Sequence, residues 1–160
     1  MPEGPLVVAR PTTVLWLPEL SEDAVLAAMK AGQGYVTESP TGPALVMTVD
    51  GQPMGSVAAE PRMARVEIKG AKGDRLVYFD ATGEIGSALI EADDWRHEFA
   101  IGGARGFIRA EIVAEASRER LGAEFLALIE GRELPWQLRG VNLGEQAIRR
   151  AIGNPVYIGS

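Results

Sequence analysis

The sequence predicts a mainly β protein: an antiparallel β-sandwich with a short N-terminal strand–helix segment and two helices near the C-terminus. Apolar and polar residues alternate with a period of two through most of residues 35–113. Glycines separate the alternating segments at intervals of roughly ten residues, which is typical of short strands joined by turns. Apolar residues at helical spacing are confined to the two ends of the chain.

The first part of the chain predicts one strand followed by one helix. Residues 12–17 are β-branched and apolar and favour a short buried strand. Ser21 is a suitable helix N-cap, and the two acidic residues after it lie where the helix dipole favours anions. Gly32 is a natural end for this helix. The apolar period changes from 3.6 to 2 just beyond it, so a domain boundary is expected there.

The middle of the chain predicts a series of antiparallel strands. Asp50-Gly51 follows the alternating residues 45–49 and is the strongest hairpin signal of the sequence. A last strand, PVYI, is expected to return to the sheet near the C-terminus. The other strands are predicted at 64–69, 75–80, 84–90, 95–101 and 105–113.

Two helices are predicted between the last strands. One spans residues 117–130, and a second spans 143–152, where Asn142 and Glu145 resemble a capping box and Gly153 ends the helix. Their apolar stripes are Leu121, Phe125, Leu128 and Ile129 in the first helix, and Leu143, Ala147, Ile148 and Ile152 in the second. Two arginine pairs are interpreted as solvated helix faces: Arg118 with Arg120, and Arg149 with Arg150.

Composition excludes several function classes. The chain has 16 basic and 22 acidic residues and a net charge of −6, so it has no basic excess with which to bind nucleic acid or an anionic membrane. It has no cysteine, which excludes disulfides and thiolate chemistry. No signal peptide and no apolar run of about 18 residues is recognised. A cytoplasmic location is therefore expected.

The residues capable of hydrolytic chemistry are few. His97 is the single histidine, and alternation places it beside Trp95 on the apolar face of its strand, where a packed histidine is expected rather than a metal ligand. Glu91, Asp93 and Asp94 lack the spacing of a calcium loop and are interpreted as a polar turn. An enzyme in its own right would need a carboxylate-only site around these acids. We predict no catalytic residue and no metal ligand in this chain.

Several short motifs occur in a particular order along the chain. A strand is followed by a helix that ends in an alanine-glycine sequence, then Y-V-T, a Gly/Pro segment, V-D-G, G-F-x-R-A-E and N-P-V-Y. This order resembles the C-terminal region of CehA/McbA-type metallohydrolases of the PHP (polymerase and histidinol phosphatase) superfamily. The corresponding residues are Thr12 to Trp16, Ala27 to Gly32, Tyr35 to Thr37, Ser39 to Pro43, Val49 to Gly51, Gly106 to Glu111 and Asn154 to Tyr157.

The resemblance implies a non-catalytic accessory or interaction domain of a metal-dependent phosphoesterase. In that family a cluster of His, Asp and Glu holds the divalent metals (Zn, Mn or Fe), and its ligands lie N-terminal to the part matched here. This chain has no H-x-H and no D-x-H motif, so no cofactor is expected in it. The implied partners are the catalytic PHP domain of the parent enzyme and a second copy in a homo-oligomer. The implied domains are 1–34, the tail of the catalytic domain, and 35–160, the β-sandwich.

Four residues are the candidates for a ligand or interface role. Thr37, Ser39 and Thr41 lie in the loop that joins the helix to the sandwich, and Trp136 follows a proline in an irregular stretch. The competing interpretations are a linker stiffened by prolines and a tryptophan used in packing. The alternative function is a carbohydrate- or ligand-binding β-sandwich module, for which Trp95 and Trp136 would supply an aromatic platform.

Overall fold

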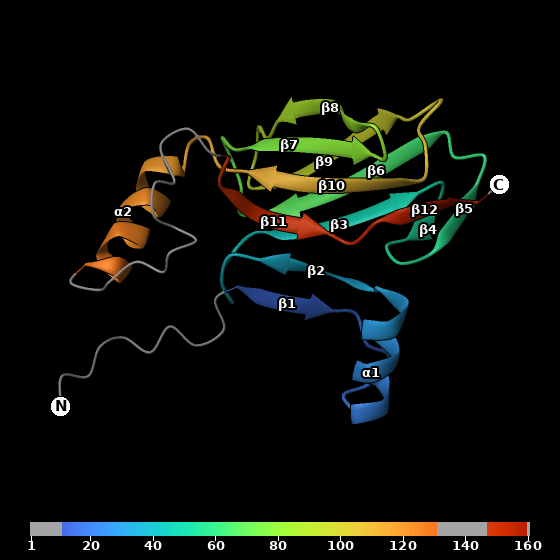
Figure 1. The fold of residues 1–160 in the computed structure, drawn as a ribbon, viewed down its shortest axis with the longest axis horizontal. Helices are drawn as coiled ribbons and strands as arrows, with labels where there is room; N and C mark the ends of the chain where they lie inside the picture. The colour runs from blue at the N-terminus through green and yellow to red at the C-terminus, as the bar shows by residue number, and fades with distance from the viewer. Residues whose placement is uncertain (1–10, 131–146, 160) are drawn as a thin grey trace.

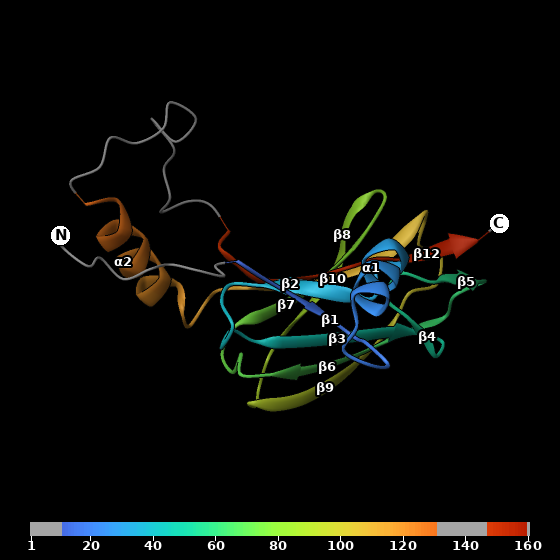
Figure 2. The ribbon, with the colours of Figure 1, turned by 90° about the horizontal axis from the view of Figure 1, so that it is seen from below.

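The computed structural model describes residues 11–130 and 147–159. Two β-sheets pack face to face as a sandwich, which confirms the predicted fold class (Figures 1 and 2). The first sheet contains β1 (Thr12–Leu15), β2 (Gly34–Thr37), β5 (Val57–Ala59), β7 (Arg75–Asp80), β8 (Gly83–Leu89), β10 (Phe107–Val113), β11 (Arg149–Gly153) and β12 (Val156–Gly159). The second contains β3 (Ala44–Val49), β4 (Gln52–Pro53), β6 (Met63–Lys69) and β9 (Asp94–Ala100).

Strand β10 organises the first sheet. It pairs with β7 on one side and with β11 and β12 in succession on the other, and β2 and β1 continue the sheet beyond β11. Strand β6 holds the centre of the second sheet, where Val66 lies opposite Met47 of β3 and His97 of β9. All pairings described are antiparallel except that of β12 with β5.

The core lies between the sheets and follows directly from the alternation of the sequence. Leu45, Met47 and Val49 of β3 are fully buried, and the residues between them are only partly covered. Burying such side chains contributes about 1.5 to 3 kcal/mol each. From the first sheet, the same core receives Leu76, Tyr78, Ile108, Ala110, Ile112, Ala151 and Val156.

The Asp50-Gly51 hairpin is confirmed. Both residues have positive φ, 47° and 83°, as a two-residue turn between antiparallel strands requires. The Asp50 carboxylate also accepts hydrogen bonds from the backbone N–H groups of Arg62 and Met63, at 2.7 and 3.1 Å. One side chain therefore holds both the turn and the start of β6.

The N-terminal strand and helix also form as predicted. Helix α1 (Glu22–Ala31) begins at Ser21, whose hydroxyl accepts from Ala24 N, and ends at Gly32 in the left-handed conformation. Strand β1 pairs with β2 and so extends the first sheet across the expected boundary at residue 34. The end of α1 lies against Gly55, in the loop between β4 and β5 (Figure 1). The division into 1–34 and 35–160 stays a prediction.

The prediction of a second C-terminal helix, at residues 143–152, is wrong for the part of it that the structure describes. Helix α2 (Arg118–Ile129) matches the first prediction, but β11 occupies residues that were expected to be helical. Ala151 pairs with Ile112 of β10 and with Thr37 of β2, so pairing on both sides outweighs the local helical spacing. The proposed helix start, including Leu143, lies outside the described residues. The short strands β4 and β5 are additions that the sequence did not indicate.

Within residues 11–130 and 147–159, neither helix is both long enough and apolar enough to span a lipid bilayer.

Candidate functional site: an arginine cluster beside a polar cavity

An irregularity in β11 places an arginine at one end of the sandwich. Val113 of β10 pairs with Arg149, whereas the adjacent Ile112 pairs with Ala151, so Arg150 is the extra residue of a β-bulge. A bulge redirects the side chain that it inserts. Arg149 extends along the sheet to Glu111, and Arg150 turns instead toward β2 and the loop before β7.

The Arg150 guanidinium forms a buried cluster with two carboxylates. It donates from Nη2 to Glu38 Oε1 at 2.7 Å and from Nε to both oxygens of the same carboxylate at 3.1 and 3.2 Å. Its Nη1 donates to Asp74 Oδ2 at 2.6 Å and to the Gly70 carbonyl at 3.3 Å. The side chains of Arg150, Glu38 and Asp74 are 10%, 15% and 1% exposed, so these contacts are largely screened from water.

Asp74 connects the cluster to the start of α2. Its Oδ1 accepts from the backbone N–H groups of Glu115 and Ser117 at 2.9 and 3.2 Å, and the Ser117 hydroxyl donates to both of its oxygens. Burial alone would raise the pKa of Asp74, but these hydrogen bonds and the one from Arg150 outweigh burial and lower the pKa. Burial likewise opposes the charge of Arg150, yet Glu38 and Asp74 raise its pKa.

Folding stability is expected to depend on the charge of Asp74. Because its folded pKa lies below the ordinary value of 3.8, its contribution is complete above that value and is lost as the pH falls through the lowered pKa. We expect urea denaturation between pH 7 and pH 2 to show falling stability below about pH 4. The Asp74→Asn variant should be less stable at pH 7 and lose less on acidification. If the unaltered chain and Asp74→Asn lose the same amount of stability on acidification, the assignment to Asp74 is contradicted.

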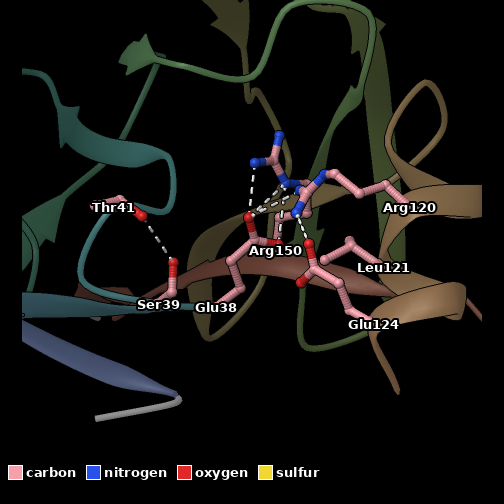
Figure 3. Close-up of a pocket in the computed structure, with 7 residues that line it drawn as sticks. All are labelled: Glu38, Ser39, Thr41, Arg120, Leu121, Glu124 and Arg150. Carbon is pink, nitrogen blue, oxygen red and sulfur yellow. Dashed lines mark hydrogen bonds and ion pairs between the residues drawn. The ribbon is translucent and has the colours of Figure 1, made fainter. Parts of the chain in front are cut away.

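A polar cavity of about 360 Å³ lies beside the cluster (Figure 3). Ser39 and Thr41 line it, and their hydroxyl oxygens face each other at 3.4 Å (Figure 3). Thr37 does not line it; that side chain is buried and donates to the Arg150 carbonyl at 3.4 Å. The remaining lining residues are Glu38, Arg120, Leu121, Glu124 and Arg150.

The charges around this cavity are paired with one another. Arg120 of α2 donates to Glu38 at 3.3 Å and to Glu124 at 2.7 Å, so Glu38 joins α2 to β11 through two arginines. This arrangement fixes the relative positions of β2, β11 and α2. The hydroxyls of Ser39 and Thr41 and the partly exposed ends of Arg120 and Glu124 are the groups that a small polar molecule would meet.

The most buried members of this site are not indicated by the sequence. Arg149 and Arg150 were expected on a solvated helix face, but both lie on a strand, and Arg150 is buried. The correction follows from the mistaken helix at 143–152, since only strand pairing aims these side chains at acids far away in sequence. Another buried carboxylate, that of Glu111, is held in the same way by Arg149 and by Arg109, the latter at 2.6 Å.

The histidine lies where alternation places it. His97 and Trp95 are half-buried on the inner face of β9, their rings stacked 5.0 Å apart. His97 Nδ1 lies 3.0 Å from the hydroxyl of Tyr78, a residue whose pKa is raised by burial. Asp94, from the acidic turn, pairs with Lys69 at 3.7 Å. The described part of the chain contains no group of three or more His, Cys, Asp or Glu side chains arranged to hold a metal ion.

The fourth candidate, Trp136, lies outside the described residues. Comparisons of the chain with protein-family models, with curated proteins and with solved structures find no match.

Proposed function

We propose that this chain is a non-catalytic accessory and interaction domain, and that its partner is the catalytic domain of a metal-dependent phosphoesterase of the PHP class. Two lines support the proposal. The order of the sequence motifs resembles the C-terminal region of such enzymes, which assigns the divalent metals to the catalytic domain. The second line, which carries the proposal, is an apolar surface on α1 that the sandwich does not cover.

The α1 surface is defined as Leu20, which precedes the helix, and Leu26 and Met29, which lie three residues apart on the helix itself. Their exposed fractions are 93%, 47% and 60%, and Ala28 is the one buried residue of the helix. A surface helix normally turns its apolar side chains toward its own core, because their burial is the main source of helix stability in a protein. In α1, Leu26 and Met29 are instead exposed and point away from the core. Exposed apolar side chains that lie next to each other, as Leu26 and Met29 do at a spacing of three residues on a helix, mark an interaction site.

The charges around the α1 surface complete its description. Glu19, Glu22 and Asp23 lie beside Leu20 at the start of the helix, and Lys30 lies in its last turn. An apolar centre with a charged rim is the usual composition of a protein–protein interface. The catalytic domain should therefore present an apolar patch that is flanked by basic groups near the start of α1.

The ionisable groups inside the sandwich are engaged in holding the fold. His97 is bonded to Tyr78, Glu38 and Asp74 to Arg150, and Glu111 to two arginines. Each carboxylate of these pairs accepts charged hydrogen bonds and stabilises the junction between strands. This use supports a structural rather than a chemical role for them.

The test begins with the DNA upstream of the coding segment. We expect a reading frame, continuous or adjacent, that encodes H-x-H and D-x-H motifs. Its product, co-expressed with residues 1–160, should co-purify as a stoichiometric complex. The Leu26→Asp variant should weaken this association at least tenfold, because it puts a charge at the centre of the apolar surface.

The Leu89→Asp variant is the matched control. Leu89 is 55% exposed but lies on β8, away from α1 (Figure 1). Isothermal titration calorimetry of both variants against the catalytic domain should show weakened binding for Leu26→Asp alone. Equal weakening, or no binding by the unaltered chain, would contradict the proposal, as would phosphatase turnover by residues 1–160 supplied with Mn²⁺ or Zn²⁺.

A further inference from the structure

Among the strands that the structure describes, β1 forms one end of the first sheet. Its successive residues direct their backbone N–H and C=O groups alternately toward β2 and away from it. Trp16 N donates to Gln33 O at 3.2 Å, which sets the hydrogen-bonded positions of the β1–β2 pair. In an antiparallel pair these positions alternate, so Val14 also faces β2, whereas Thr13 and Leu15 direct their N–H and C=O groups to the outer edge. Gly34 of β2, which lies opposite Leu15, supports this assignment. Its carbonyl accepts a hydrogen bond from Asn154 N, on the side of β2 that faces away from β1.

Within the part of the chain that the structure describes, the β1 edge has neither the charges nor the proline that protect the two end strands of the second sheet, β9 and β4. Strand β9 presents the charged side chains of Asp94, Arg96 and Glu98, each paired with β6. Strand β4 is two residues long and contains Pro53. Charges, prolines and short length are devices that prevent an edge from pairing with another strand. Strand β1 is also short, with four residues, but its sequence, TTVL, has no charged residue, proline or glycine.

Apolar side chains flank the β1 edge on both faces of the sheet. On the inner face, Val14 is partly buried against the core, and Trp16, which packs its ring on Tyr35, is 37% exposed. On the outer face Leu15 is half-buried, and Val36 of the neighbouring β2 is 37% exposed. An added strand would therefore gain hydrogen bonds along the edge and apolar contacts above and below it.

We propose that the strand added at the β1 edge is β1 of a second copy of this chain, paired antiparallel about a two-fold axis through Val14. Thr13 then lies opposite Leu15 of the second copy, and Leu15 opposite its Thr13. The outward N–H and C=O groups of Thr13 and Leu15 in each strand then form hydrogen bonds with those of the other strand. The contact is closed and isologous, because each copy contributes the same residues. Because β1 is uncharged, this pairing places no like charges directly opposite each other.

This register makes a sharp geometric prediction at position 14. Two residues directly opposite each other in a non-hydrogen-bonded antiparallel pair have Cα atoms about 4.5 Å apart, within the range that a disulfide spans. The chain has no cysteine, so a Val14→Cys variant can form a single bond between copies. Two copies of residue 13 would be offset along the strands by two residues, roughly 8 Å apart, which is beyond disulfide reach.

The experiment compares oxidation of Val14→Cys and Thr13→Cys on the full chain. We expect a covalent dimer of Val14→Cys to form at least tenfold faster than one of Thr13→Cys, and the unaltered chain to sediment at twice its mass of 17.1 kDa. Val14→Lys and Val14→Asp should each sediment as monomers, and their equimolar mixture as a dimer.

The outcomes separate this inference from the proposed function. A monomeric unaltered chain at concentrations up to about 100 μM, or equal crosslinking of the two cysteine variants, would overturn the β1 pairing. The paired charge variants answer the objection that either one alone fails to fold, since a misfolded chain gives no mixed dimer. The contact uses β1 and leaves the α1 surface unoccupied, so Leu26→Asp is expected to leave the dimer intact.

Discussion

Replacing Arg150 with methionine is expected to lower the free energy of unfolding by about 3 to 5 kcal/mol, because it leaves buried carboxylates without their cation. Methionine matches the length of the arginine stem, so packing is largely kept while the charge and its hydrogen bonds are removed. Asp74 is 1% exposed and would then have to be protonated or solvated within the fold. The loss should also release the start of α2, since Asp74 holds Glu115 and Ser117.

Two comparisons make the Arg150 prediction specific. Arg65→Met breaks the pair with Glu98, whose members are 62% and 60% exposed, and should change stability by less than about 1 kcal/mol. Adding Glu38→Gln to Arg150→Met should recover part of the loss, because a neutral amide costs less to bury than a carboxylate. Urea denaturation at pH 7 measures all three. A loss for Arg150→Met no larger than that for Arg65→Met would show that the cluster contributes little.

The sequence predicts the sandwich well where each strand carries its own signal. In β6 and β9 apolar and polar residues alternate, and in β3 the larger apolar residues recur at every second position. The inward-facing positions of Leu45, Val66 and Trp95 follow from these patterns. The hairpin at Asp50 follows from a turn that only a few residue pairs can form. These features depend on neighbours in the chain, so one sequence suffices to indicate them.

Strand β11 could not be predicted from local sequence in this way. Its residues, RRAIG, have no alternation, and the apolar spacing around them suits a helix. What determines their conformation is pairing with β10 and β2, which lie far away in the chain. The bulge at Arg150 also interrupts any period of two. Neither feature leaves a local pattern.

The candidate site was predicted in part for the same reason. Ser39 and Thr41 were singled out because their loop was expected to join the helix to the sandwich, and both residues line the cavity. The charged residues of the cavity come from β11, from α2 and from Glu38 just after β2. Nothing in the local sequence distinguishes Arg150 from a solvated arginine. Only the fold brings Arg150 to Glu38 and Asp74.

Replacing Gly55 with alanine is expected to lower the free energy of unfolding by about 2 to 5 kcal/mol, combining backbone strain with a steric clash. Gly55 has a φ of 86°, and an added Cβ would lie 1.8 Å from the carbonyl oxygen of Ala31 at the end of α1. Both backbones meet at this point, so neither can yield by a rotamer change. The helix should be pushed away from the sandwich, which would also disturb the bond from Asn154 to the Gly32 carbonyl.

Gly51→Ala separates strain from clash. Gly51 has nearly the same φ, 83°, but has no atom within 4 Å of the position that its Cβ would take. Its replacement should cost only the backbone term, about 1 to 2 kcal/mol. Denaturation of both variants gives the difference, and hydrogen exchange should show the amide of Gln33, bonded to Ala28 O, losing protection in Gly55→Ala alone. Equal losses would mean that α1 is not fixed to the sandwich through this glycine, and the α1 surface would then lack the rigid support that a docking face needs.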